Sequence, residues 1–222
     1  MGAPHGHRLH FHGHSPLHRA PAHLKVAGLV AFMLVVVATP VPWVPAFVGY
    51  AGVLAVLVAL SGVPVPYLAR RMVIETPVLV FAALLPFIAV GPRTEVLGLS
   101  LSEAGLVAAG GLVMKATLGV VASLLLAATT DPRDLLAGLE RLRVPAQLVQ
   151  IMGFMIRYLD VVTDELRRMR TAMESRGFTA RDPRHWPVIG RSAGALFIRS
   201  FERGERVHLA MISRGYDGSV RR

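Results

Sequence analysis

The chain has 222 residues, of which 53% are hydrophobic, with a mean hydropathy of +0.52, no cysteine and a formal net charge of +10 at pH 7. This apolar fraction exceeds the roughly 45–50% that is ordinary for soluble domains, and the lack of cysteine excludes disulfides and thiolate metal sites. A net positive charge of this size first suggests a nucleic-acid partner. Whether that suggestion holds depends on where the charges lie in the chain.

Positive charge is concentrated late in the chain. Between Leu24 and Thr130 the basic residues are Lys25, Arg70, Arg71, Arg93 and Lys115. From Asp131 onward arginine occurs seventeen times, with eleven acidic residues among the arginines. The interleaved acids and the apolar first part argue against a nucleic-acid binder.

Residues 1–23 form a histidine-rich leader that Gly and Pro interrupt. Its histidines are His5, His7, His10, His12, His14, His18 and His23. We expect a flexible cytoplasmic segment, since it lacks the long apolar run of a signal peptide. Histidine-rich tracts can bind transition metals, but a tail with no required role explains the composition as well, so we assign no metal site.

Residues 24–130 carry four apolar segments, which are Leu24–Val41, Val44–Val63, Met72–Val90 and Glu103–Ala128. Crossing a bilayer takes about 20 residues, with a range of 17–25, so all four are long enough, the first narrowly. A backbone in lipid must satisfy its own hydrogen bonds, which predicts helices. Residues 40–45, 62–71 and 91–100 are rich in Pro or Gly and predict the connecting loops.

The basic residues at the joins predict the orientation. Arg70 and Arg71 place the second join in the cytoplasm, because positive residues favour that side. The leader and the chain after Ala128 are then cytoplasmic as well, and the join that contains Arg93 is outside.

Two ionisable residues lie inside the apolar segments. Glu75 is near the start of the third segment, within reach of Arg70 or Arg71, and Lys115 is near the middle of the fourth. A charge at mid-bilayer costs about 2.5–3.5 kcal/mol and usually faces protein or water. Lys115 therefore either contacts a partner membrane subunit, or snorkels or pairs inside the helix bundle.

Residues 131–222 mix charged and apolar residues, unlike the apolar segments before them. Pro132 at the start and Pro145 at the end predict one short helix. From Ala146 to Gly177 apolar residues recur every three or four positions, which predicts one long amphipathic helix. Trp186–Val207 is apolar but broken by Arg191 and Arg199, so a further crossing, a re-entrant segment and an interfacial helix all remain open. The whole pattern predicts an all-α integral membrane protein with about four to six transmembrane helices and long amphipathic cytoplasmic helices.

A short phrase occurs twice in this last part, as MESRGF at Met173–Phe178 and MISRGY at Met211–Tyr216. Each Ser-Arg-Gly triplet follows an apolar helical stretch, and Gly is favoured just past a helix end. An arginine there complements the helix dipole, so two ordinary helix ends would explain the pattern. Matching flanks and an aromatic after each Gly favour a function, because guanidinium groups pair with carboxylates in a fixed geometry.

The chain resembles the transmembrane T component of energy-coupling factor transporters, a branch of the ATP-binding-cassette importers. The resemblance covers His18–Val26, the basic fourth apolar segment ending in Leu124–Pro132, Asp134–Pro145 and the two triplets. In that family a short X-Arg-X signature, often Ala-Arg-Gly, ends each of two coupling helices. The opening segment and the length are most similar to the cobalt and nickel branch, CbiQ, although related T components serve vitamin uptake.

The resemblance implies a non-catalytic, multi-pass subunit of a prokaryotic cell membrane, without a cofactor of its own. Its partners would be two ATPase subunits and a substrate-binding membrane S component. The ATPase-coupling residues would be Ser175, Arg176, Gly177, Ser213, Arg214 and Gly215, with Ser in place of the common Ala. The chain contains no phosphate-binding loop motif, so ATP hydrolysis is expected in the partners.

One rival interpretation is a membrane enzyme that acts on lipid phosphates. It would need carboxylates that gather around metal ions, and the candidates are Asp131, Asp134, Asp160, Asp164 and Glu165. Asp160 and Asp164 fit a solvated helix face equally well.

Overall fold

The computed structural model describes residue 18, residues 20–96 and residues 99–216. The chain forms two compact units, which meet in the sequence between Leu142 and Arg143. The elements of the first unit are α2 (Ala22–Ala38), α3 (Val44–Ser61), α4 (Val65–Arg71), the 3-10 helix η2 (Met72–Glu75), α5 (Thr76–Ile88), β1 (Arg93–Val96), β2 (Leu99–Ser102), α6 (Glu103–Thr129) and α7 (Pro132–Arg141). Those of the second are α8 (Ala146–Ser175), the 3-10 helix η3 (Pro183–His185) and α9 (Trp186–Ile212).

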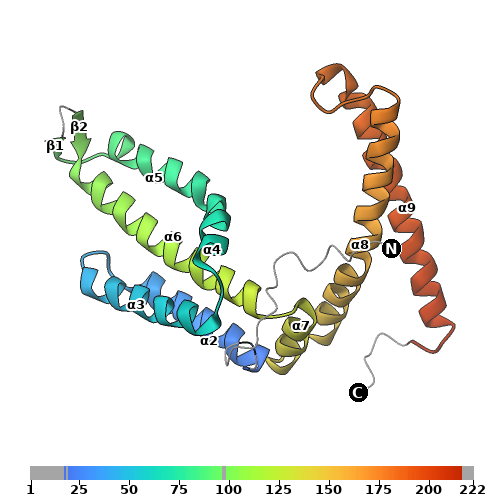
Figure 1. Cartoon of the computed structure of the whole chain (residues 1–222), viewed down its shortest axis with the longest axis horizontal. Helices are drawn as coiled ribbons and strands as arrows, with labels where there is room; N and C mark the ends of the chain where they lie inside the picture. The colour runs from blue at the N-terminus through green and yellow to red at the C-terminus, as the bar shows by residue number, and fades with distance from the viewer. Residues whose placement is uncertain (1–17, 19, 97–98, 217–222) are drawn as a thin grey trace. The chain divides into compact units, whose positions relative to one another are not determined.

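The first unit is built around α6, which has α5 on one side and α2 and α3 on the other (Figure 1). Its main core joins α2, α3 and α6 through Val36, Phe47, Leu54, Leu118 and Ala122. A second cluster, of Val63, Leu68 and Ala128, lies where α4 meets the end of α6. Glycine permits the close approach of α5 and α6, because a Cβ at Gly105 would lie 2.7 Å from the carbonyl oxygen of Leu85.

Three helical segments are long and apolar enough to cross a membrane, namely Val44–Ser61, Val65–Ile88 and Glu103–Thr129. Helix α2 is a fourth apolar helix, and its 17 residues meet the lower limit of the 17–25 that a crossing takes. All of these helices expose large apolar side chains, for example Leu34 at 66% and Val48 at 66%. Such surface suits lipid, and the predicted all-α membrane fold is confirmed for the described residues.

The prediction of a loop at Gly62–Arg71 is wrong for most of that segment. Gly62 ends α3 with a φ of 69°, but Val65–Arg71 is helical and continues through η2 into α5. The prolines explain the error, because Pro64 is the N-cap residue and Pro66 lies in the first turn of α4, where a missing N–H costs nothing. Arg70 and Arg71 therefore lie in the last turn of α4.

The join at residues 91–100 contains an antiparallel β-hairpin in which Arg93 pairs with Ser102 (Figure 1). The side chain of Ser102 also caps α6, since its Oγ accepts a hydrogen bond of 3.3 Å from the N–H of Gly105. The helix expected after Asp131 is α7, whose start is capped by the Asp131 carboxylate at 2.8 Å from the N–H of Arg133. Helix α7 packs against α2 and so belongs to the first unit.

The second unit is a hairpin of two long helices, α8 and α9, which are close where they are connected and spread apart toward their other ends (Figure 1). The predicted long amphipathic helix is confirmed as α8, which starts directly after Pro145 and has 30 residues. Helix α9 begins at Trp186 as expected but ends at Ile212, five positions beyond the apolar segment, and it is not among the three candidate spans. Neither helix has a fully buried residue, so both present long faces to their surroundings.

Candidate functional site

The first Ser-Arg-Gly triplet forms the C-terminal cap of α8. Gly177 has a φ of 79°, and its N–H donates to the carbonyl oxygen of Glu174 at 3.0 Å. The N–H of Phe178 donates to the carbonyl oxygen of Met173, also at 3.0 Å. This pair of bonds is the Schellman motif, which closes a helix through a left-handed residue.

The second triplet closes α9 in the same way. Gly215 has a φ of 85°, and its N–H donates to the carbonyl oxygen of Ile212 at 2.9 Å. The N–H of Tyr216 donates to the carbonyl oxygen of Met211 at 3.0 Å. Both triplets are thus helix ends, as predicted, and they share one backbone geometry.

The serine hydroxyls repeat the same bond as well. Ser175 Oγ donates to the carbonyl oxygen of Ala172, and Ser213 Oγ donates to that of Ala210, both at 3.0 Å. The repeated phrase therefore has seven letters, AMESRGF and AMISRGY, rather than six. The extra alanine was visible in the sequence, but its carbonyl partner was not.

The aromatic that follows each glycine contacts the beginning of the other helix. The ring of Phe178 meets the ring of His185, directly before α9, edge to face at 5.3 Å between centroids. The hydroxyl of Tyr216 donates to Gln150 Oε1, in the second turn of α8, at 2.7 Å. These contacts give the repeated aromatic a physical role, because each one fixes a cap against the neighbouring helix.

Arg176 and Arg214 project from these caps. Both are exposed, and neither guanidinium has a hydrogen bond or an ion pair within the described chain. Because α8 and α9 are antiparallel, the two arginines stand at opposite ends of the hairpin. The 27 residues of α9 extend about 40 Å at 1.5 Å a residue, which gives the scale of their separation.

Polar contacts hold the two helices together between the caps. Glu165 on α8 bonds Arg199 at 3.1 Å and Arg203 at 3.5 Å on α9, and its side chain is 13% exposed. Ser192 Oγ also donates to the sulfur of Met173 at 3.2 Å. In the sequence Glu165 was one of several acids on a mixed helix, so its bridging position could not be distinguished from a solvated one.

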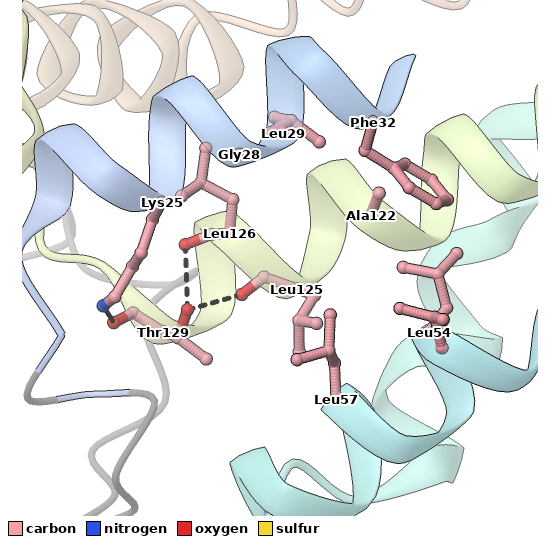
Figure 2. A pocket seen from close by; sticks show the side chains of 11 residues that line it. Lys25, Gly28, Leu29, Phe32, Leu54, Leu57, Ala122, Leu125, Leu126 and Thr129 are labelled. Carbon is pink, nitrogen blue, oxygen red and sulfur yellow. Dashed lines mark hydrogen bonds between the residues drawn. The ribbon is translucent and has the colours of Figure 1, made fainter. Parts of the chain in front are cut away.

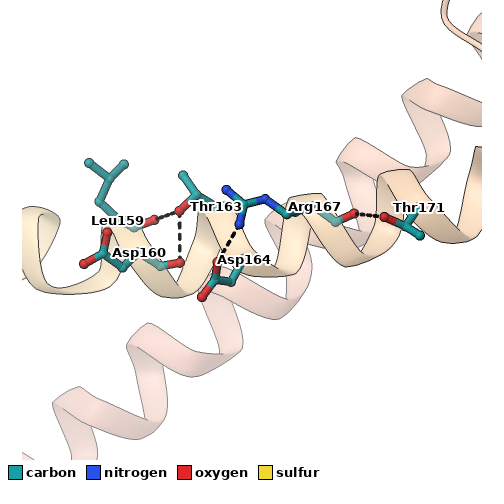
Figure 3. Close-up of polar contacts among 6 residues, drawn as sticks. All are labelled: Leu159, Asp160, Thr163, Asp164, Arg167 and Thr171. Carbon is teal, nitrogen blue, oxygen red and sulfur yellow. Dashed lines mark hydrogen bonds and ion pairs between the residues drawn. The ribbon is translucent and has the colours of Figure 1, made fainter. Parts of the chain in front are cut away.

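Polar side chains on α8 form hydrogen bonds and an ion pair with groups of the same helix, as Figure 3 shows. Thr163 Oγ1 donates to the carbonyl oxygens of Leu159 and Asp160 at 2.8 and 2.9 Å. Asp164 pairs with Arg167 at 3.7 Å, with both side chains more than half exposed. Within the described residues no three His, Asp or Glu side chains gather where they could hold a metal, so the five acids of the rival enzyme interpretation do not form a cluster.

The two ionisable residues of the apolar helices contact groups inside the first unit. Lys115 is partly buried on α6, and its Nζ donates to the carbonyl oxygen of Val37 near the end of α2 at 2.8 Å. Glu75 is 2% exposed and accepts a hydrogen bond of 2.6 Å from Thr117 Oγ1 on α6. The expected contact of Lys115 with a partner membrane subunit stays a prediction.

Comparison with known proteins adds a family match. The family model CbiQ, described as cobalt transport protein, matches residues 13–222. The chain is 32% identical over 124 residues to the cobalt transport protein CbiQ of Rhodobacter capsulatus, covering 56% of this chain and 51% of that one. It is 32% identical over 120 residues to the energy-coupling factor transporter transmembrane protein EcfT of Staphylococcus aureus, covering 50% and 43%.

A further match, at 37% identity over 103 residues, is an uncharacterized protein of Methanocaldococcus jannaschii, with 46% of this chain and 38% of that one covered. The chain thus spans about half or less of the length of these curated relatives.

Proposed function

The chain belongs to the CbiQ/EcfT family of transporter membrane proteins, and from this premise we propose that it is the T component of an energy-coupling factor importer. In this role it binds two ATPase subunits through Arg176 and Arg214 and transmits their motion to a substrate-binding membrane subunit. It carries out no chemical step itself, and it works as a multi-pass protein of the cell membrane.

The observation that carries the proposal is the pair of matching helix caps. Each cap presents one exposed arginine without a partner in the described chain. The two caps share one backbone geometry and lie at opposite ends of the α8–α9 hairpin. Two like groups about 40 Å apart suit two like partners better than one. A guanidinium group fits a carboxylate-lined groove because it offers five donors in a rigid fork.

The hairpin between the caps suits a coupling role. Glu165 and the aromatic caps tie α8 to α9, so a displacement at one arginine is carried along the helix pair. Large apolar side chains such as Leu159 and Phe201 remain 55% and 60% exposed, and these faces are available to further subunits.

We propose cobalt, or nickel as its close relative in ligand preference, as the transported substrate. The description of the matched family and the name of the Rhodobacter capsulatus relative support cobalt. A vitamin is the second candidate, since the chain also matches transmembrane proteins named only for energy coupling. Uptake of radioactive cobalt, nickel and vitamins by cells that depend on this transporter distinguishes these cargos.

The role of the arginines is tested by the double substitution Arg176→Ala and Arg214→Ala. We expect the protein to remain in the membrane while uptake falls to background and the ATPases no longer copurify. Each truncated charged contact should cost about 2–5 kcal/mol of binding.

A matched control is Arg168→Ala with Arg206→Ala, which removes one exposed arginine from the body of each helix. This control should keep uptake and copurification. Normal uptake in the Arg176 and Arg214 double variant would exclude the proposed role.

A further inference from the structure

Two adjoining cavities open near the start of α2, and Lys25 lines both of them. The first has a volume of about 300 Å³ and lies between α2, α3 and α6 (Figure 2). The second, of about 280 Å³, lies between the start of α2 and helix α7. Both cavities are lined by residues of the first unit only, and neither has a role in the proposed coupling.

The first cavity is apolar along its length. Its walls include Leu29, Phe32, Leu54 and Leu57, and the polar side chains in its lining, Lys25 and Thr129, lie together at one end (Figure 2). The Thr129 hydroxyl is already used, since it donates to the carbonyl oxygen of Leu125 at 2.8 Å. The walls therefore offer an occupant apolar contact and no free hydroxyl donor, which suits a hydrocarbon chain.

The second cavity is polar and basic. Its lining contains two permanently basic residues, Lys25 and Arg141, one acidic residue, Asp134, and the histidines His18 and His23. Lys25 Nζ donates to the carbonyl oxygens of Thr129 at 2.9 Å and His18 at 3.4 Å and to Thr130 Oγ1 at 3.3 Å, and these contacts hold the ammonium group where Lys25 lines both cavities. A basic pocket at the end of membrane helices attracts an anionic lipid head group.

We propose that the two cavities together bind one anionic phospholipid. One of its two acyl chains occupies the apolar cavity along α2, α3 and α6, and its phosphate occupies the basic cavity near Lys25, His23 and Arg141. An amphipathic anion matches both cavities at once, because a free phosphate leaves the apolar cavity unused and a neutral lipid leaves uncompensated the excess of Lys25 and Arg141 over Asp134.

The test uses the purified full chain, stripped of lipid in detergent, and native mass spectrometry with dioleoyl phosphatidylglycerol or dioleoyl phosphatidylcholine. We expect one phosphatidylglycerol to be retained in preference to phosphatidylcholine. Arg141→Gln should weaken phosphatidylglycerol binding about fivefold, the factor for one basic residue near a lipid surface. Arg133→Gln is the control on the same helix, since Arg133 is exposed and outside the basic cavity.

A second variant blocks the apolar cavity. A Cβ at Gly28, which lines this cavity, meets no atom within 4 Å, so Gly28→Phe adds bulk at the cavity without a clash against the backbone. We expect it to abolish retention of phosphatidylglycerol. Gly49→Phe is the control, because Gly49 on α3 is equally open but does not line the cavity.

Four outcomes would overturn the proposal. These are equal retention of the two lipids by the unsubstituted chain, equal affinities of the Arg141 and Arg133 variants, equal retention by the Gly28 and Gly49 variants, and displacement of the lipid by millimolar inorganic phosphate. The last result would identify a site for free phosphate. Since Arg141 is exposed on α7, its variant keeps the test decisive even if Gly28→Phe misfolds.

Discussion

At the scale of single residues, the glycine that follows each of the two arginines closes its helix. Gly177 and Gly215 have φ values of 79° and 85°, in the left-handed region that other residues enter at a cost. A Cβ at either position would meet no atom within 4 Å, so the requirement for glycine comes from the backbone alone and not from crowding. The arginine that precedes each glycine is exposed.

We predict that Gly177→Ala and Gly215→Ala each destabilise the protein, because alanine in the left-handed conformation costs about 1–2 kcal/mol. Gly194→Ala should act in the opposite direction, by about 1 kcal/mol, since Gly194 lies inside α9 with open space around it. Thermal unfolding of the purified variants, followed by circular dichroism, measures both effects. A lower melting temperature for all three variants, or for none, would contradict this account.

At the scale of elements, the carboxylate of Glu165 supplies the ion pairs that join α8 to α9 within the described residues. Glu165 bonds two arginines of α9 and is 13% exposed at its side chain, whereas the neighbouring Asp164 is 53% exposed and bonds only along its own helix. Exposed pairs contribute little, while shielded charged hydrogen bonds contribute more. Of these two adjacent acids, Glu165 therefore joins α8 to α9, whereas Asp164 forms an ion pair within α8.

Substituting Glu165→Gln should loosen the hairpin by about 1 kcal/mol, because two charge-assisted bonds become neutral ones. Hydrogen–deuterium exchange should then be faster along α9. The isosteric change Asp164→Asn is the control and should leave exchange in α9 unaltered. If both variants exchange alike, the Glu165 contacts do not hold the helices together.

At the scale of the whole molecule, the apolar helices and the charge distribution predict its orientation in the membrane. We predict four crossings, by α2, α3, the segment from α4 to α5, and α6, which would place both ends of the first unit on one side. Positive residues favour the cytoplasm, so this side is expected to be cytoplasmic, with both arginine caps also there. The β-hairpin between α5 and α6 would then lie outside.

The absence of cysteine makes this orientation directly testable, since each introduced thiol is the only one present. We predict that Arg93→Cys reacts with a membrane-impermeant maleimide in intact cells. Thr179→Cys and Arg206→Cys, at exposed positions of the second unit, should react only after the membrane is permeabilised. Labelling of Arg93→Cys and Thr179→Cys from the same side would contradict the predicted orientation.

The sequence by itself determined the apolar helices, the long helix from Ala146 and the two helix ends at Gly177 and Gly215. Each of these follows from residues that are near one another in the chain, through hydrophobic spacing, proline at helix starts and glycine at helix ends. The longest local error, at Val65–Arg71, arose because proline signals a helix start as readily as a loop.

Only the tertiary structure decided which remote groups meet. It brought Glu165 to Arg199 and Lys115 to the carbonyl of Val37, it tied Phe178 and Tyr216 to the opposite helix, and it joined the two cavities at Lys25. Such contacts link positions that are between seven and more than a hundred residues apart. Local patterns carry no information on these distances, because they are set by how the helices pack and not by the propensities of the residues within them.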